Sequence, residues 1–600
     1  MKLRTAALTL AALFSSTTAH AGGWLKVDGT QIVDGSGKPV ILRGMGLGGW
    51  MLQEGYMLKL GEVGQQHKIR AKLVELVGEE RTAQFYRAWL DNHTTEADIA
   101  AMAKWGFNSV RLPIHFDQLT LPADNEPKAG QDTWHEEGFA RIDRLLAWSK
   151  ANRIWLILDL HAAPGGQGND LAISDRDPSK PSLWQSDENQ RKTVALWSKL
   201  AARYRDEPWI GAYDLINEPN WSFATPGKGN GCDETGNEAV WSLQQRITAA
   251  IRKVDQKHIV IIEGNCWGNN YKGLPPAWDA NMALSFHKYW NRNDEASIAG
   301  IKALRTGTNR PIWLGESGEN SNGWYRDAIA LVEGDGIGWN FWPLKKIGFN
   351  QPLEIVAGDG WAKIVAWMTG KGPKPAADEA FVAMMQLAEN TRFDRNVPKP
   401  DVIDAMFRQP RDASYRAFMP RTLGSKALTI AAVDYDLGPP DVAYRDTVDA
   451  NYHVATGGER TPWNNGTTYR NDGVDIAHEA NGAPHVSDFV TGEFMRYSAD
   501  VAKAGRWTVS ARVRSVKGGR IGIDERGVAV PAGTEWQVVK LAEVDLPAGP
   551  GATTLRALDC SDCEVAELVF TPRQGRNPIA SRASCLHKRT GRASGGMPCP

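Results

Sequence analysis

The hydrophobic pattern of the chain alternates, for about 350 residues, between short apolar runs and longer segments of helical periodicity. Runs such as "IWLILDL" and "IVII" are almost wholly apolar, which is typical of parallel strands covered on both faces. Segments 136–150 and 238–254 repeat apolar residues at helical spacing. The predicted strands, most of them followed by a helix, are Val40–Arg43, Phe107–Leu112, Ile154–Leu160, Ile210–Ile216, His258–Glu263, Ala283–His287, Ile312–Glu316 and Ile337–Trp342.

Eight strands that alternate with helices predict an α/β fold, the (β/α)8 TIM barrel. A doubly wound open sheet is the alternative. It would carry a glycine-rich phosphate turn after an early strand, and the run "GMGLGGW" from Gly44 to Trp50 lacks the required spacing. The barrel is therefore favoured, with two further helical segments, 377–390 and 400–409, expected on its outside.

The pattern changes after about residue 426, where short β-prone segments are separated by Gly, Asn and Pro. "RWTVSARVRSV", "WQVVKLAEVDL" and "AELVF" are examples, and they predict a C-terminal β-sandwich domain. The last stretch is basic and rich in Gly and Ser. The predicted organisation is a signal peptide at 1–21, a barrel at 22–423, a β-sandwich at 424–572 and a tail at 573–600 that a disulfide could close into a loop.

The first residues have the pattern of an export signal. Lys2 and Arg4 precede an apolar run at 6–14 that is too short to cross a bilayer, and Ala19-His20-Ala21 is a small-x-small cleavage pattern. The protein is therefore expected to be secreted, to the periplasm or outside the cell. After removal of the signal no membrane association is expected.

Composition and charge narrow the classes of partner. The 69 basic and 70 acidic residues nearly cancel in charge, so we expect no strong electrostatic field that would attract nucleic acid. The 24 Trp outnumber the 13 Tyr and the 16 Phe. An excess of flat, rigid indole rings suits a protein that stacks on sugar rings.

Polar side chains gather at the predicted strand ends, and active sites of parallel barrels lie at the C-terminal ends of the strands. Two of these side chains, Glu218 in "DLINEPNW" and Glu316 in "WLGES", follow strands that face each other across a closed barrel. Paired carboxylates of this kind suit retaining glycoside hydrolysis, which uses one as nucleophile and one as acid/base. The strand-end set as a whole comprises Arg111, Asp159, His161, Asn217, Glu218, Glu263, His287, Tyr289, Glu316 and Trp342, of which Asp159 and Glu263 are interpreted as structural.

The remaining roles follow from chemistry at the two carboxylates. A nucleophile must stay ionised, and Arg111, His287 and Tyr289 are candidates to hold Glu316 charged. An acid must stay protonated, which burial and the neighbouring Glu316 favour for Glu218. Asn217 is placed to hydrogen-bond a sugar hydroxyl, and Trp342 offers a flat surface for a sugar ring.

The motifs "LINEP", "SFHKY", "WLGES" and "WNFWP" resemble glycoside hydrolase family 5 over residues 24–410. This resemblance implies that Glu218 is the acid/base and Glu316 the nucleophile. It also implies that Arg111, His161, Asn217, His287, Tyr289 and Trp342 support them. The stretches "ILRGMGLGGWML" and "DLHAAPGGQ" resemble the β-1,3-glucanase members, whereas "FWPLKK" resembles bacterial members described as cellulases. The expected substrate is therefore a β-glucan with its linkage open; an exo-β-1,3-glucanase and a β-mannanase are alternatives.

The β-sandwich resembles carbohydrate-binding modules of families 6 and 35 in "AYRDTVDANYHVATGG", "YRNDGVDI" and "DFVTGEFMRYSADV". The family uses aromatic residues on loops at one edge, and Tyr452, Trp463 and Tyr469 are the candidates; plain core packing is the alternative. Ala432 and Asp434 stand where a Glu-x-Glu calcium pattern is expected, which argues against a structural calcium ion.

Six cysteines in an exported chain favour local disulfides. Cys232 and Cys266 follow neighbouring strands on the same rim and are expected to pair. A zinc half-site is the alternative for Cys560 and Cys563, but no matching His/Cys pair is found at zinc spacing. The remaining cysteines are Cys585 and Cys599.

Two other classes of protein compete with a glycosidase. A non-catalytic glycan-binding barrel would have lost one glutamate, and both are present. A metal-dependent hydrolase would need a His-x-His start and clustered His and Asp at the strand ends, which this sequence lacks. The expectation is a monomeric enzyme that needs no cofactor for catalysis.

Overall fold

The computed structural model describes residues 23–289, 291–447, 469–523 and 525–573. Eight parallel strands close into a barrel in the order β10-β3-β4-β5-β6-β7-β8-β9. This closed sheet confirms the predicted (β/α)8 barrel. The strands are β3 (Arg43–Gly46), β4 (Ser109–His115), β5 (Trp155–Ala162), β6 (Ile210–Asp214), β7 (Ile259–Glu263), β8 (Met282–Lys288), β9 (Ile312–Ser317) and β10 (Gly338–Phe341).

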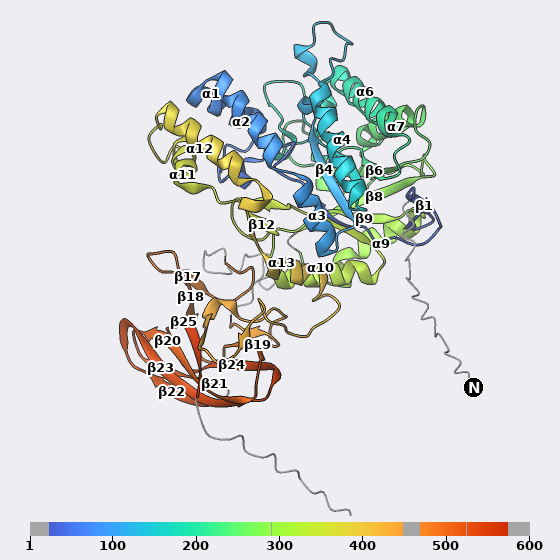
Figure 1. Cartoon of the computed structure of the whole chain (residues 1–600). Helices are drawn as coiled ribbons and strands as arrows, with labels where there is room; N and C mark the ends of the chain where they lie inside the picture. The colour runs from blue at the N-terminus through green and yellow to red at the C-terminus, as the bar shows by residue number, and fades with distance from the viewer. Residues whose placement is uncertain (1–22, 290, 448–468, 524, 574–600) are drawn as a thin grey trace, which may run out of the picture. The chain divides into compact units, whose positions relative to one another are not determined.

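Helices surround the barrel, and most of them bury one apolar side against it. In α7, for example, Val240, Leu243, Ile247 and Ile251 are buried at helical spacing. Helices α1, α2, α11 and α12 lie together beside the barrel strands (Figure 1). The helices are α1 (Gln66–Val77), α2 (Glu79–Asn92), α3 (Glu96–Trp105), α4 (Glu136–Ala151), α5 (Leu171–Ser174), α6 (Asp187–Tyr204), α7 (Glu238–Arg252), α8 (Asn265–Gly268), α9 (Glu295–Thr308), α10 (Asn322–Gly334), α11 (Gly358–Met368), α12 (Ala377–Asn390) and α13 (Pro400–Phe407).

A hairpin closes the N-terminal end of the barrel. It consists of β1 (Lys26–Asp28) and β2 (Gln31–Val33), which pair antiparallel. Leu25 and Ile32 form one buried cluster with Leu42, Ile157 and other residues from the early part of the barrel strands. At the other end, β11 (Lys345–Lys346), β12 (Leu353–Glu354) and β13 (Val397–Pro398) form a small separate sheet.

The first barrel strand lies three residues later than its predicted position. The apolar run 40–42 suggested a strand over Val40–Arg43, but Leu42 belongs to the buried cluster at the N-terminal end. The ladder itself runs over Arg43–Gly46, where Gly44 pairs with Asn340 and with Ser109. A Cβ at Gly44 would lie 2.5 Å from the Asn340 Oδ1 atom. The glycines of this strand therefore leave room for polar side chains inside the barrel.

Two six-stranded sheets follow the barrel in the sequence, as the β-sandwich prediction requires. In β20 (Gly505–Ser515), Trp507, Val509, Ala511 and Val513 are buried while the residues between them are not. One sheet has the order β14 (Thr422–Leu423), β19 (Phe494–Val501), β24 (Gly549–Asp559), β21 (Gly519–Ile523), β22 (Arg526–Val530), with β16 (Tyr444–Arg445) beside β19. The other has the order β17 (Ile476–His478), β18 (Pro484–Phe489), β25 (Cys563–Pro572), β20, β23 (Gly533–Leu546), with β15 (Leu428–Ala431) beside β25.

By its internal contacts the chain divides into two compact units. One, the barrel unit, comprises the described residues of 23–418 and 436–487; the other comprises those of 419–435 and 488–573. Within the barrel unit, Asn471 donates its Nδ2–H to the Asn320 carbonyl at 2.8 Å, and its backbone N–H to Asp401 at 2.8 Å. The segment around Asn471 thus belongs to the barrel unit, although it lies beyond the boundary at 423 that the sequence suggests. In the part of the chain that the structure describes, no helix is long and apolar enough to cross a membrane.

Candidate active site

Glu316, near the end of β9, is held by two donors at the C-terminal rim of the barrel. Arg111 on β4 donates from Nη1 to Glu316 Oε2 at 2.8 Å, and the Tyr289 hydroxyl donates to Oε1 at 2.6 Å. Arg111 is wholly buried and also donates to Asp214 and to the Asn217 side chain. Because a guanidinium keeps its positive charge, this surrounding suits an ionised carboxylate whose orientation is fixed.

Glu218 follows β6 and has different partners. The Nδ1 atom of His287 lies 2.6 Å from Glu218 Oε1, and its Nε2 atom lies 3.1 Å from Glu263 Oε1. Glu263 also accepts the backbone N–H of Glu218 at 2.7 Å. His287 therefore bridges the carboxyl groups of Glu218 and Glu263. Glu263 thus holds Glu218 in two ways, through His287 at the side chain and directly at the backbone N–H.

Local backbone geometry turns Glu218 towards the inside of the rim. Its φ of +44° lies in the left-handed region, which costs a non-glycine residue on the order of 1 kcal/mol. The Glu263 contact to its N–H and the Asn217 N–H bond to Leu160 O, at 3.1 Å, hold this conformation. Pro219, which follows, disfavours a right-handed helical conformation at Glu218, so the chain does not continue there as a helix.

The ionisation of this group follows from burial and from the neighbouring charges. Burial raises the pKa of Glu218 to about 7; His287 opposes the rise and Glu316 adds to it. Burial would also raise the pKa of Glu263, but His287 and Arg111 outweigh it and lower that pKa to about 2. Burial alone would lower the pKa of His287, yet Glu263 and Glu218 raise it well above its usual value. Near neutral pH, Glu218 can therefore both hold and release a proton, beside an ionised Glu263 and a cationic His287.

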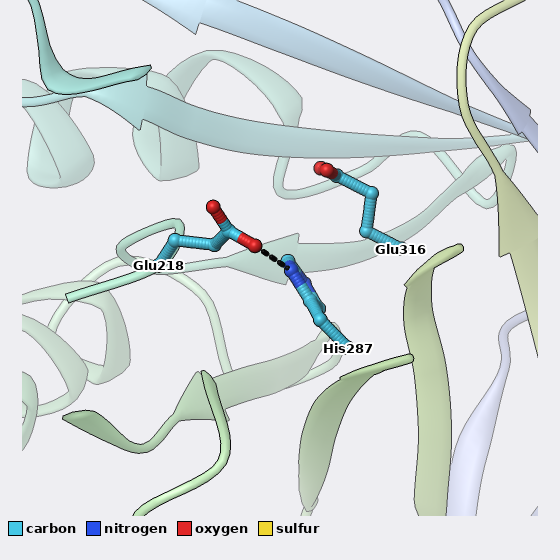
Figure 2. A group of neighbouring side chains, drawn as sticks. All are labelled: Glu218, His287 and Glu316. Carbon is cyan, nitrogen blue, oxygen red and sulfur yellow. Dashed lines mark hydrogen bonds and ion pairs between the residues drawn. The ribbon is translucent and has the colours of Figure 1, made fainter. Parts of the chain in front are cut away.

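The two candidate catalytic carboxyl groups face each other. Figure 2 shows the side chains of Glu218 and Glu316 extending towards each other from opposite sides, with the His287 side chain between them. One side-chain oxygen of each glutamate and one His287 nitrogen lie within 4.8 Å of one another. This trio is also where the described residues could hold a metal ion. A ligating imidazole must be neutral, however, and here both ring nitrogens are engaged by carboxylates that favour the cation.

Trp342, directly after β10, places a buried aromatic ring beside these groups. Its ring stacks on the His161 imidazole with centroids 5.0 Å apart and planes 4° apart. A Cβ at Gly46 or at Gly48 would lie 2.7 Å or 2.5 Å from the Trp342 ring. The glycine run from Gly44 to Trp50 lacks the spacing of a phosphate-binding turn. Its glycines at 46 and 48 are explained instead by the space that the Trp342 indole needs. Its Nε1–H donates to the Tyr56 hydroxyl at 2.8 Å, which in turn donates to Glu319 at 3.1 Å.

The structure brings the predicted residues Arg111, His161, Asn217, Glu218, His287, Tyr289, Glu316 and Trp342 together on one rim. One expectation differs: His287 was assigned to Glu316, but its hydrogen bonds are with Glu218 and Glu263. The sequence interpretation also treated Glu263 as structural and missed Tyr56 and Glu319. Glu263 ends its strand directly after an apolar run, as Glu218 nearly does, and this shared position was the available signal.

Two disulfides are found among the described residues. Cys232 pairs with Cys266 across the loops after β6 and β7, with Cα atoms 4.7 Å apart, and Cys560 pairs with Cys563. Cys585 and Cys599 lie outside the described residues, as do Tyr452 and Trp463. Tyr469 lies 6.2 Å from the Phe418 ring, between centroids, inside the barrel unit.

A parallel barrel whose rim presents two facing carboxyl groups in different environments defines the class of protein as a glycoside hydrolase. A family model described as cellulase (glycosyl hydrolase family 5) matches residues 71–347. A beta-xylosidase of Phanerodontia chrysosporium is 31% identical over 372 residues, which are 55% of this chain and 73% of that protein. The chain belongs to glycosyl hydrolase family 5.

Other relatives carry different names. A probable glucan 1,3-beta-glucosidase A of Emericella nidulans is 32% identical over 50% of this chain and 71% of its own length. Endoglucanase C of Acetivibrio thermocellus is 31% identical over 34% of this chain and 53% of its own length. Among solved structures, "Cellulase Cel5C_n" is 20% identical, covers 54% of this chain and 81% of its own, and has a TM-score of 0.36.

Proposed function

We propose that the protein is a secreted, retaining β-glucan hydrolase in which Glu316 is the nucleophile and Glu218 the acid/base. The observation that carries this proposal is that one carboxyl oxygen of Glu218 and one of Glu316 lie within 4.8 Å of each other. Retaining enzymes place the pair about 5–5.5 Å apart, whereas inverting enzymes leave about 6.5–9.5 Å for a water molecule.

In the first step a Glu316 oxygen attacks the anomeric carbon while the bond to the leaving sugar breaks. Glu218, protonated below a pKa of about 7, gives its proton to the departing oxygen. Arg111 and Tyr289 hold Glu316 at its two oxygens, so its attack needs little reorganisation. The ring of Trp342 lies against the sugar, and the side chain of Asn217 hydrogen-bonds the 2-hydroxyl of that sugar.

In the second step Glu218, now ionised, takes a proton from water, whose oxygen attacks the same carbon and releases Glu316. The cationic His287 at 2.6 Å stabilises the ionised form that this step needs. No cofactor enters either step, because the carboxyl groups and water supply every proton and electron pair.

The names of the relatives support a β-glycan substrate and leave its linkage open. Two of them are named for glucan hydrolysis, with β-1,3 bonds named in one, and a third is a beta-xylosidase. β-Glucan is the substrate proposed here, and an exo-β-1,3-glucanase fits the same site. Secretion is proposed from the signal-peptide pattern of residues 1–21.

Proton NMR of early products tests the double displacement. On laminarin, lichenan and carboxymethyl-cellulose in turn, the first product formed from the hydrolysed polymer is expected to be the β-anomer, because two inversions restore the starting configuration. The α-anomer as first product would contradict the mechanism. Absence of turnover on all three polymers would contradict the substrate class.

The pH dependence of kcat/KM should carry the signature of Glu218. Because its pKa is raised to about 7, the protonated acid predominates below that pH and is lost above it. On natural glucan, kcat/KM is expected to fall about tenfold per pH unit above this pKa. A substrate whose leaving group needs no proton should lack this decline. A decline of equal size on both substrates would assign it to another group.

The β-sandwich is proposed to be a carbohydrate-binding module, which tethers the enzyme to insoluble glucan. Among the described residues of 419–435 and 488–573, Trp536 is the aromatic side chain that is not buried. The guanidinium carbons of Arg512 and Arg514 lie 4.7 and 4.4 Å from its ring centroid. Trp536 is therefore a candidate sugar platform, in addition to Trp463, which lies outside the described part of the chain.

Point variants of the full chain test this tether better than truncation, since the segment around Asn471 is part of the barrel unit. In a Glu316→Gln background, Trp536→Ala or Trp463→Ala should weaken retention on insoluble β-glucan about tenfold. Val516→Ser, at an exposed apolar residue of the same unit, is the control and should not change retention. Retention that is unchanged in both tryptophan variants would remove the binding role.

A further inference from the structure

Asn471, which comes long after the last barrel strand in the sequence, is buried against the connection that follows the candidate nucleophile. Only 3% of the residue is exposed. Its side-chain N–H groups donate to the Asn320 carbonyl at 2.8 Å and to Asn322 Oδ1 at 3.2 Å. Its own carbonyl accepts the Asn322 N–H at 2.8 Å. One asparagine thus makes three hydrogen bonds to the connection between β9, which carries Glu316, and α10.

Asp401 on α13 completes this arrangement. Its Oδ2 atom accepts the backbone N–H of Asn471 and the Nδ2–H of Asn322, both at 2.8 Å. All three residues are buried. Because a buried polar group without a partner is costly, these hydrogen bonds specify one position for the connection after β9. Residues 320–322 are therefore held between α13 and the segment around Asn471.

Glu319, which directly precedes these residues, extends the same connection into the candidate site. Its φ of +49° lies in the left-handed region, which a non-glycine residue keeps only where the surroundings determine it. Its carboxylate accepts hydrogen bonds from Lys346 Nζ and, at 3.1 Å, from the Tyr56 hydroxyl. That hydroxyl in turn accepts the Trp342 Nε1–H at 2.8 Å. A continuous set of contacts therefore leads from the connection after β9 to the indole ring at the rim.

We infer that Asn471 is a positioning residue for the candidate active site. It fixes the backbone beside Glu319, whose contact with the Tyr56 hydroxyl sets the orientation of Trp342. This inference rests on the proposed function, in which the Trp342 ring lies against the sugar that is retained on the enzyme. The rim of the barrel is then completed by a segment that follows the barrel in the chain, beyond the boundary at 423 that the sequence suggests.

A double-mutant cycle with Tyr56→Phe tests this path. Asn471→Ala keeps both backbone contacts of residue 471 and is expected to lower kcat/KM on β-gluco-oligosaccharides about tenfold, because the sugar is then less well positioned. In a Tyr56→Phe background, where the hydroxyl that joins Glu319 to Trp342 is already absent, the same substitution should lower kcat/KM less than about twofold. A merely structural role would reduce the fraction of folded enzyme by the same factor in both backgrounds. Equal losses in both backgrounds would therefore overturn the inference.

A second variant, Asn471→Asp, separates hydrogen bonding from the filling of space. It keeps the size of the side chain, but a carboxylate cannot donate to Asn320 or Asn322, so the loss should be at least that of Asn471→Ala. It also replaces Asn471→Ala in the cycle if that variant is insoluble. Activity equal to the parent enzyme in Asn471→Asp would show that the side chain only fills space. Asn481→Ala makes the same change at an exposed residue of the barrel unit, and this control should leave kcat/KM unchanged in either background.

The choice of substrate gives a further readout. β-Glucosyl fluoride and β-gluco-oligosaccharides share the retained sugar and differ in the leaving group, so the loss in Asn471→Ala should agree between them within about twofold. A loss confined to the oligosaccharides would place the effect on the leaving group and would contradict a path through Trp342. Failure of the proposed function is a separate result, because it would appear as hydrolysis that survives in Glu316→Gln.

Discussion

Glu316→Gln is expected to lower turnover of β-glucan by about four orders of magnitude or more. A neutral amide cannot form the glycosyl ester, yet it has nearly the shape of the carboxylate. Binding of the oligosaccharide should therefore persist and can be measured by calorimetry. Arg111 loses a charged partner in this variant but keeps Asp214, whose oxygen lies 2.9 Å from its Nε atom, so the barrel should remain folded.

The control for this variant is Glu379→Gln, which makes the same chemical change at an exposed position on α12. Its turnover should equal that of the parent enzyme. Turnover close to the parent value in a Glu316→Gln preparation free of parent enzyme would remove Glu316 from the role of nucleophile. Loss of both turnover and oligosaccharide binding would show that the side chain is needed for binding, and the kinetic loss would then no longer identify the nucleophile.

Glu218→Ala is expected to lower kcat/KM on unactivated glucan by about two to four orders of magnitude, the usual contribution of a positioned acid. On substrates with good leaving groups the first step should keep much of its rate, because departure needs little proton transfer. The glycosyl-enzyme should then accumulate, since its hydrolysis still lacks a base. A pre-steady-state burst on an activated substrate, followed by slow turnover, is the measurement.

A second property separates this variant from a general disruption of the site. Glu218 sets the decline of kcat/KM above a pH of about 7, and the variant should lose that decline. Equal losses on activated and natural substrates, with the pH dependence preserved, would assign the acid/base role to another group. Glu263 would then be the next residue to test, because it contacts both His287 and the Glu218 backbone.

Much of the fold was predictable because it depends on local pattern. Near-continuous apolar runs mark strands that are covered on both faces, and their number and alternation with helices define the barrel before any contact is known. The same logic places Glu218 and Glu316 at the rim, since each lies two residues after such a run. Pro219 does not belong to this local information, because β6 already ends at Asp214, five residues before it.

The tertiary structure decided what depends on closing the ring. Which carboxylate His287 meets is set by the stagger of β8 against β7 and β9, and no local pattern contains that stagger. Glu263 looked structural for the same reason, because its partner Glu218 lies 45 residues away on the neighbouring strand end. From the sequence, Gly46 and Gly48 were only part of a glycine run that lacks the spacing of a phosphate-binding turn. In the structure, the ring of Trp342, which directly follows the last barrel strand, fills the space next to them.

The sequence by itself determined the elements and the kinds of residue at their ends. The tertiary structure determined which of those residues touch, because side-chain partners across a barrel are fixed by strand stagger and by packing between residues far apart in the chain.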